Sequence, residues 1–154
     1  MTSHQAYHKG KDLRHWYNGV VPCAKQVVGS DWQLFLAMLA ATSPRRTVDH
    51  NVKLAFKALE QYHNKEAWSG FMGKSHTANL DRAVQGLPLQ GQKVRAFYQN
   101  LVGGTTSVTV DSWIMRLYIG KDRATVKEIR YITACITRGA KRFHITPMEY
   151  QAAI

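Results

Sequence analysis

Three residues between Gly91 and Tyr118 have side chains and spacing that are suited to chemistry. Asp111 stands directly before the apolar segment "SWIMRLYIG", Arg116 follows it by five residues, and Lys93 precedes it by eighteen. A carboxylate can stabilise positive charge that develops on a substrate and can activate a water or an amine. A lysine amine can itself attack as a nucleophile. The group therefore suits cleavage of a bond whose carbon becomes positively charged.

Asp111 also has a purely structural interpretation. An aspartate before an apolar helical segment is a common helix N-cap, which contributes about 1 kcal/mol to stability. The two roles are compatible, because one aspartate can cap a helix and still act on a substrate. In either case the sequence predicts a helix that begins just after Asp111.

The sequence around Asp111 resembles that of the helix-hairpin-helix DNA glycosylases, the superfamily of endonuclease III. Val110, Asp111 and Arg116 reproduce the "VD-x-x-x-x-R" pattern, in which the catalytic aspartate lies at a helix start. The upstream segment "WQLFLAMLAATSPRRTVDHN" is similar to the buried helix and the following turn of that family, so the resemblance covers roughly residues 30 to 120. It implies an all-α, compact multi-helix domain that flips a base out of the DNA stack. Asp111 is then the carboxylate that helps to cleave or exchange the N-glycosidic bond.

The hairpin of that family corresponds to "LPLQGQ", which keeps Gly91 but not the paired glycines. The resemblance makes Gly91 and Arg95 expected contacts of DNA. Lys93 has two interpretations. Its spacing from Asp111 matches the nucleophilic lysine of bifunctional members, which would give lyase activity. Alternatively, "GQKVRAF" matches an earlier helix of the family and Lys93 is a surface residue.

The turn "TSPRR" after the upstream helix is the region where this family lines its base pocket and inserts a wedge into DNA. The resemblance therefore assigns pocket or wedge roles to Ser43 and DNA contacts to Arg45 and Arg46. A helix-ending turn with solvated arginines is the alternative. Trp113 is a further candidate for the pocket or for base stacking, although its helical spacing after Asp111 also suits a core position.

The charge balance favours a polyanionic partner. Twenty-one Lys and Arg against ten Asp and Glu give a formal net charge of +11, and DNA, RNA and anionic membranes all attract such a protein. The excess is strong from Arg116 onward, and "RGAKRF" is its densest part, with Arg138, Lys141 and Arg142. With the resemblance, these four cations are expected contacts of DNA, most simply double-stranded DNA. A solvated helix face is the alternative for each of them.

Other classes of protein find little support. No stretch approaches the roughly 20 apolar residues of a membrane span, and the N-terminal residues do not resemble a signal peptide. We therefore expect a cytoplasmic protein, in the host cytoplasm if a phage encodes it. Cys23 and Cys135 lack the close spacing of a zinc site or an iron-sulfur cluster, so we expect neither metal nor cofactor.

Hydrophobic periodicity and capping signals predict a series of helices. Ser30 and Gln33 have capping-box spacing before a buried helix, Pro44 ends that helix, and an amphipathic helix begins near Thr47. The remaining elements are predicted in chain order: a short helix and then a loop within 64–79, a helix–loop–helix over 80–102, an extended "TTSVTV", a helix after Asp111, a helix over 125–138 and a terminal helix after Thr146.

We therefore predict six to eight helices in one domain over residues 1–154, of the helix-hairpin-helix glycosylase type and without an iron-sulfur cluster. Residues 1–29 are expected to form a polar, partly flexible leader. Three functions remain open. The first is a DNA glycosylase-like enzyme. The second is a phage-type enzyme that modifies thymine in hypermodified DNA, since "KVRAFYQNL", "VTVDSW" and "TPMEYQAAI" are similar to such members. The third is a non-catalytic DNA-binding protein on the same scaffold.

Overall fold

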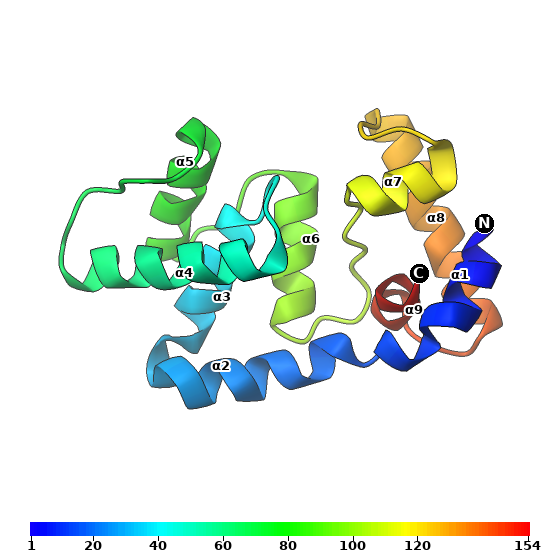
Figure 1. Ribbon diagram of the computed structural model, residues 1–154, viewed down its shortest axis with the longest axis horizontal. Helices are drawn as coiled ribbons and strands as arrows, with labels where there is room; N and C mark the ends of the chain where they lie inside the picture. Colours follow the sequence, from blue (N-terminus) through cyan, green and yellow to red (C-terminus); the bar gives the residue numbers. More distant parts are fainter. The chain divides into compact units, whose positions relative to one another are not determined.

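A computed structural model describes residues 1–154 and consists of nine α-helices with short 3₁₀ turns and no strand (Figure 1). The all-helical prediction is thus confirmed. The helices are α1 (Ser3–Gly10), α2 (Val20–Val28), α3 (Trp32–Thr42), α4 (Val48–His63), α5 (Gly73–Val84), α6 (Gln92–Leu101), α7 (Ser112–Ile119), α8 (Val126–Arg142) and α9 (Pro147–Ala153). None of these helices has both the length and the apolar character that crossing a membrane requires.

The chain divides into two compact units, whereas the sequence predicts a single domain. Unit 1 contains residues Met1–Val20 and Gln99–Ile154, and unit 2 contains residues Val21–Tyr98. The boundaries fall at the start of α2 and within α6. Each unit is described below by itself.

In unit 1, α9 packs against α1 and α8, and α7 packs against α8. Ile132 and Ile136 of α8 are fully buried in the core of this unit. Tyr150 of α9 lies so close to α8 that a Cβ atom at Gly139 would be 2.5 Å from its ring. Any side chain at Gly139 would therefore push α8 and α9 apart.

In unit 2, α3 is the central helix and packs against both α4 and α5. Its residues Leu36, Met38 and Ala40 are almost completely buried, as the dense apolar sequence predicts. The predicted capping box at Ser30 is wrong. Ser30 lies in a 3₁₀ turn, Gly29–Asp31, and α3 begins after it without a side-chain cap. Helix α3 is held by burial of its apolar residues rather than by its N-cap.

The order of elements between α4 and α5 also differs from the prediction. The short helix expected first is absent, and α5 begins at Gly73 and runs on through Val84. Gly70 and Gly73 have φ angles of 77° and 69°, which favour glycine and do not fit an α-helix. No helix therefore continues through Gly70, and α5 starts only at Gly73. Gln61 of α4 holds the loop, because its amide donates to Ser69 Oγ at 2.8 Å and its oxygen accepts from the Ser69 backbone at 3.1 Å.

Several element boundaries agree with the sequence signals. Helix α3 ends before Pro44, Thr47 caps α4, and Thr146 forms a capping box with Glu149 at the start of α9. The basic segment "RGAKR" belongs to α8, which is longer than predicted and ends at Arg142.

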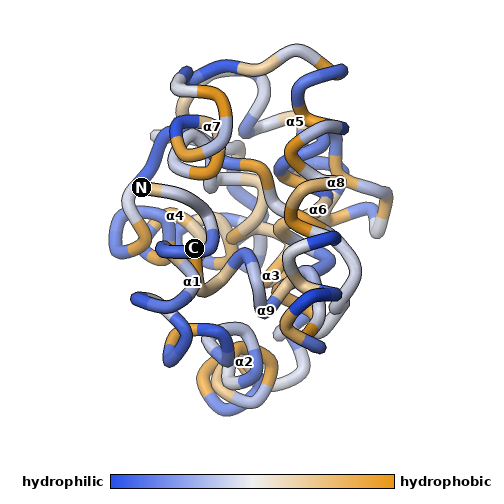
Figure 2. The backbone as a smooth tube through the Cα atoms, turned by 90° about the vertical axis from the view of Figure 1, so that its right-hand side faces the viewer, coloured by the Kyte–Doolittle hydropathy of each residue, from blue (hydrophilic) through white to orange (hydrophobic).

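Residues 1–29, predicted as a polar and partly flexible leader, contain α1, 3₁₀ turns and α2. Tyr7 and Tyr17 in this segment are buried. Tyr7 stacks on Phe143 with ring centroids 4.2 Å apart. Figure 2 shows hydrophobic and hydrophilic residues alternating along single helices such as α2, as expected of amphipathic helices.

Candidate functional site

Asp111 lies where an extended segment of unit 1 meets helix α7. Val108 and Val110 are buried and anchor the extended segment, while Asp111 itself is half-buried. Its Oδ1 accepts a hydrogen bond of 2.9 Å from the backbone N–H of Ile114, so Asp111 is the N-cap of α7 as predicted. The α7 backbone thus fixes the carboxylate through one oxygen.

A buried polar network of unit 1 holds the segment that leads to Asp111. The backbone N–H of Thr109 donates to Gln151 Oε1 at 2.6 Å, and its hydroxyl donates to Asn100 Oδ1 at 2.8 Å. Gln151 Nε2 donates to the same Asn100 oxygen at 3.3 Å and to the Tyr17 hydroxyl at 3.4 Å. Because these bonds join α6, α9 and the extended segment, the terminal helix contributes directly to the position of Asp111.

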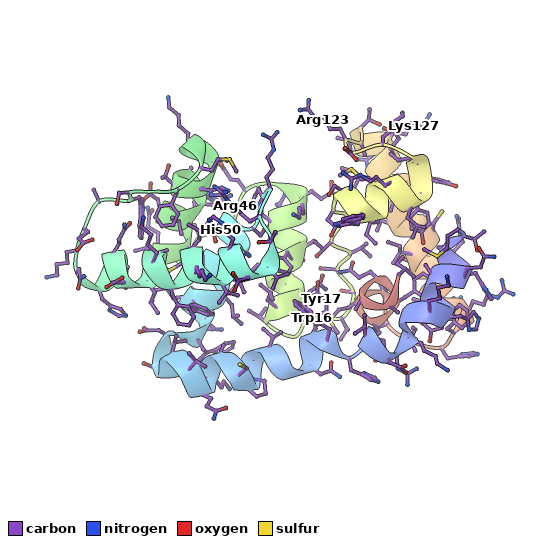
Figure 3. The ribbon with its side chains drawn as sticks, in the orientation of Figure 1. Trp16, Tyr17, Arg46, His50, Arg123 and Lys127 are labelled. Carbon is purple, nitrogen blue, oxygen red and sulfur yellow. The ribbon has the colours of Figure 1, made fainter.

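Tyr17 is the titratable group of this network, and it is near enough to Asp111 to feel its charge. Burial raises the pKa of its hydroxyl to about 12, hydrogen bonding with Gln151 and Thr109 opposes the shift, and the negative charge of Asp111 adds to it. The hydroxyl therefore stays protonated throughout the physiological range. Figure 3 shows Tyr17 next to Trp16. Their rings meet edge to face with centroids 4.4 Å apart.

Trp113 and Arg116 form an exposed pair on α7. Trp113 is 73% exposed, so the predicted alternative of a core position is wrong for this side chain. The Arg116 guanidinium lies over its ring, 4.9 Å from the centroid, and also pairs with Asp122. Hydrogen bonding with Arg116 holds the pKa of the Asp122 carboxyl below its usual range. The pair presents a flat aromatic ring and a guanidinium plane to solvent.

The basic stretch after α7 retains cations that no carboxylate neutralises. Its two acids are engaged: Asp122 with Arg116, and Glu128 with Lys121 at 2.9 Å. Capping hydrogen bonds from Thr125, together with Lys121, lower the pKa of Glu128 to about 2. The exposed cations without an ion pair are Arg123, Lys127, Arg130, Arg138, Lys141 and Arg142, of which Figure 3 labels the first two at the start of α8.

The predicted hairpin residues belong to unit 2, in the connection from α5 to α6. Gly91 is exposed with a φ of 92° and directly precedes α6. Asn79 braces this connection, because its amide donates to the Gln90 carbonyl at 3.1 Å and its oxygen accepts from the Gln90 backbone at 2.7 Å. Lys93 is half-buried and Arg95 is exposed, both in the first turn of α6.

The predicted pocket or wedge residues occupy the turn between α3 and α4. Ser43 is buried at the C-cap of α3, whereas Arg45 is exposed in a left-handed conformation with a φ of 58°. Arg46 is half-buried, and its Nε atom is shielded from solvent without a hydrogen-bond partner. Figure 3 shows Arg46 together with His50 at the beginning of α4.

The structure thus distributes the predicted residues over both units. Asp111, Trp113 and Arg116 belong to unit 1, together with the cations of α8. The hairpin and turn residues, Lys93 included, belong to unit 2. Sequence reasoning did not single out the polar network of Asn100, Thr109, Gln151 and Tyr17, nor the buried His76. One related signal is present in the sequence: the capping residues at Thr146 predict that the terminal helix, which carries Gln151, is ordered.

The chain belongs to a family of unknown function (DUF7178), whose model matches residues 3–154. No curated protein and no solved structure matches the chain.

Proposed function

We propose that the protein binds double-stranded DNA and acts as a DNA glycosylase-like enzyme, with Asp111 as the carboxylate at the reacting sugar. The observation that carries the proposal is the state of this carboxylate: Asp111 is half-buried, and the α7 backbone fixes its Oδ1. A carboxylate held in this way keeps both oxygens in a defined position, which lowers the entropy lost when it meets a substrate. The buried network around Thr109 adds to that fixation.

The proposed reaction requires little besides this carboxylate. The N-glycosidic bond breaks, and the base departs with the bonding electron pair and takes up a proton. Positive charge develops at the sugar carbon, where the Asp111 carboxylate stabilises it. The oxygen of a water then bonds to that carbon, and the proton that this water loses passes to Asp111. The residue thereby acts first through its charge and then as a base.

Surface features of unit 1 support a nucleic-acid partner. Each unpaired cation that neutralises a phosphate releases counterions from DNA, and α8 with its preceding loop carries several such cations. Aromatic rings and arginine planes stack on unpaired bases, and Trp113 with Arg116 offers both on one exposed face. A flipped base needs a partner of this kind to replace the stacking that it loses.

Asp111→Asn tests the catalytic role with little effect on folding, because asparagine is as good an N-cap as aspartate. Wild type is incubated with a panel of damaged and modified duplexes, and released bases and abasic sites are measured. We expect base release by the wild type and a loss of at least about 100-fold in the variant, with DNA affinity retained. Asp49→Asn is the matched control, since Asp49 is an exposed acid in the first turn of α4. Full activity of Asp111→Asn would refute the assignment.

Borohydride trapping tests whether Lys93 adds lyase activity. A covalent protein–DNA adduct that disappears in Lys93→Gln would identify Lys93 as the nucleophile. An active enzyme without any adduct would leave Lys93 a contact of DNA or a surface residue and would limit the reaction to hydrolysis.

The salt dependence of duplex binding tests the DNA-binding part separately. Replacing Lys141 and Arg142 with glutamine is expected to reduce the slope of log K against log salt by about one to two. Lys53→Gln is the control, because Lys53 already pairs with Asp49 at 3.0 Å. Binding that does not respond to salt would contradict the proposal. Steeply salt-dependent binding without base release from any duplex would instead indicate a non-catalytic DNA-binding protein.

A further inference from the structure

Buried polar atoms without a partner are concentrated at one place in unit 2. Four buried side-chain nitrogen and oxygen atoms of the chain have no hydrogen-bond partner, and three of these are Ser43 Oγ, Arg46 Nε and His76 Nδ1. Ser43 and His76 are 7% and 1% exposed. Leaving such an atom unsatisfied costs about 1–3 kcal/mol, so three of them together call for an explanation.

The three residues converge at the turn between α3 and α4. Ser43 and Arg46 flank this turn, and His76 reaches it from the first turn of α5, which packs against α3. The His76 imidazole lies beside the carbonyl of Pro44 and within the field of the Arg46 charge. Arg46 as a whole is only half-buried, so the cluster borders the solvent.

The chemistry of the cluster suits an anion. A serine hydroxyl and an arginine N–H are hydrogen-bond donors, and an imidazole nitrogen becomes one when it carries a proton, which a bound anion favours. No carboxylate binds them: the nearest acid in sequence, Asp49, is exposed and pairs with Lys53 at 3.0 Å. Helix α5 also begins without a side-chain cap, which leaves the backbone N–H groups of its first turn to other acceptors. Three donors near an uncapped helix start match the several acceptor oxygens of an oxyanion.

We propose that this turn binds one phosphate group, with Ser43, Arg46 and His76 as its side-chain donors. These three residues form the phosphate site. The group can come from a free phosphate monoester or from the backbone of a nucleic acid, because both present tetrahedral oxygens to the same donors. The proposal does not depend on Asp111, which belongs to the other unit.

Thermal unfolding of the full chain with inorganic phosphate provides the first test. At constant ionic strength and pH, phosphate should raise the midpoint of unfolding more than chloride does, since a ligand that binds only the folded state stabilises it. Arg46→Gln should weaken phosphate binding about tenfold, as expected for the loss of a charge-assisted hydrogen bond. Arg45→Gln is the matched control: it removes the same charge one residue away from an exposed side chain. It should alter the affinity by no more than about twofold.

Two results would overturn the proposal. Equal effects of phosphate and chloride on the wild type would mean that the cluster binds no anion. Equal losses in Arg46→Gln and Arg45→Gln would mean that diffuse charge, and not a built site, attracts the anion. If Arg46→Gln alone fails to fold, Ser43→Ala supplies the second variant, because it removes a donor that makes no hydrogen bond in the protein.

Imidazole signals in NMR spectra locate the ligand directly. Added phosphate should shift the ring resonances of His76 and leave those of exposed His63, at the other end of α4, unchanged. Repeating the titration with deoxyadenosine 5′-monophosphate and with a short DNA duplex separates the two sources of the group. A His76 shift with the duplex assigns the site to the DNA backbone, and a shift only with inorganic phosphate and the mononucleotide assigns it to a free phosphate. No shift with any of them refutes the site.

Discussion

The buried polar network of unit 1 and the phosphate site of unit 2 are both clusters of polar side chains, but they differ in how their hydrogen bonds are satisfied. Asn100, in the first, is fully buried, donates to the carbonyls of Gly104 and Ser107 and accepts from Thr109 and Gln151. In the second, buried atoms of Ser43, Arg46 and His76 have no partner at all. Folding alone therefore accounts for the first cluster, whereas the second becomes favourable only with a further acceptor.

The largest expected effect is that of breaking the satisfied network. Asn100→Ala should lower the free energy of unfolding by about 3 kcal/mol, because it leaves two half-buried carbonyls and the buried Thr109 hydroxyl without their partner. Urea denaturation followed by circular dichroism measures this loss. Asn64→Ala is the control, since Asn64 is exposed and should cost less than about 1 kcal/mol. A small loss at Asn100 would mean that the network does not stabilise unit 1.

Thr42 and Ser43, two neighbouring residues of unit 2, allow the same comparison between a hydroxyl with a partner and one without. The Thr42 hydroxyl donates to Asn51 Oδ1 at 2.7 Å, whereas the Ser43 hydroxyl has no partner. Thr42→Val should therefore cost about 1.5–2 kcal/mol in urea denaturation, while Ser43→Ala should be neutral or slightly stabilising without phosphate. Equal costs would show that Ser43 does have a partner in solution.

The pH dependence of stability tests the state of His76. Burial lowers its pKa from 6.5, the Pro44 carbonyl opposes this shift and the Arg46 charge adds to it. The unfolded chain thus takes up a proton that the folded chain resists, so the contribution of His76 to stability is constant above pH 6.5 and falls below it. The slope is at most about 1.4 kcal/mol per pH unit.

His76→Gln should remove this part of the pH dependence in urea denaturation between pH 7.5 and 5. Exposed His50 provides the control, because His50→Gln should leave the profile unchanged. If the profile of His76→Gln still matches that of the wild type, His76 is protonated as easily in the folded chain as in the unfolded one.

Arg45 gives the smallest expected effect. A non-glycine residue with a φ of 58° costs about 1 kcal/mol, so Arg45→Gly should raise the midpoint of thermal unfolding slightly, by relief of this strain. The same variant should bind DNA more weakly if the exposed Arg45 side chain contacts the backbone. A lower midpoint would show that contacts of the Arg45 side chain outweigh the strain.

Local signals in the sequence predicted those parts of the fold that depend on local physics. The N-caps at Asp111 and Thr146 need only a side-chain oxygen near the first backbone N–H groups of a helix, and both were found in the structure. The buried helix α3 followed from its apolar density. Ser30 misled the prediction, because Ser30 itself lies in a 3₁₀ turn that precedes α3.

The parts that depend on distant contacts could not be predicted in this way. Helix α1 has few apolar residues, and Tyr7 is buried only because Phe143 and Tyr150 stack on it. Likewise, nothing near His76 in the sequence indicates that α5 carries it into the turn after α3. The roles of Asp111 and Lys93 stay predictions. The motif that suggests them is a pattern of spacing along the chain, and such a pattern does not by itself determine which reaction the residues catalyse.

The close approach of α8 and α9 at Gly139 limits how the basic segment can vary among members of the family. The cations around Gly139 are exposed and can be exchanged or lost with little effect on folding, whereas Gly139 cannot be changed while Tyr150 keeps its place. Members that replace this glycine are therefore expected to carry a smaller residue than tyrosine at the position of Tyr150. The segment "RGAKRF" thus contains exposed cations that can be substituted and one glycine, Gly139, whose substitution the contact with Tyr150 prevents.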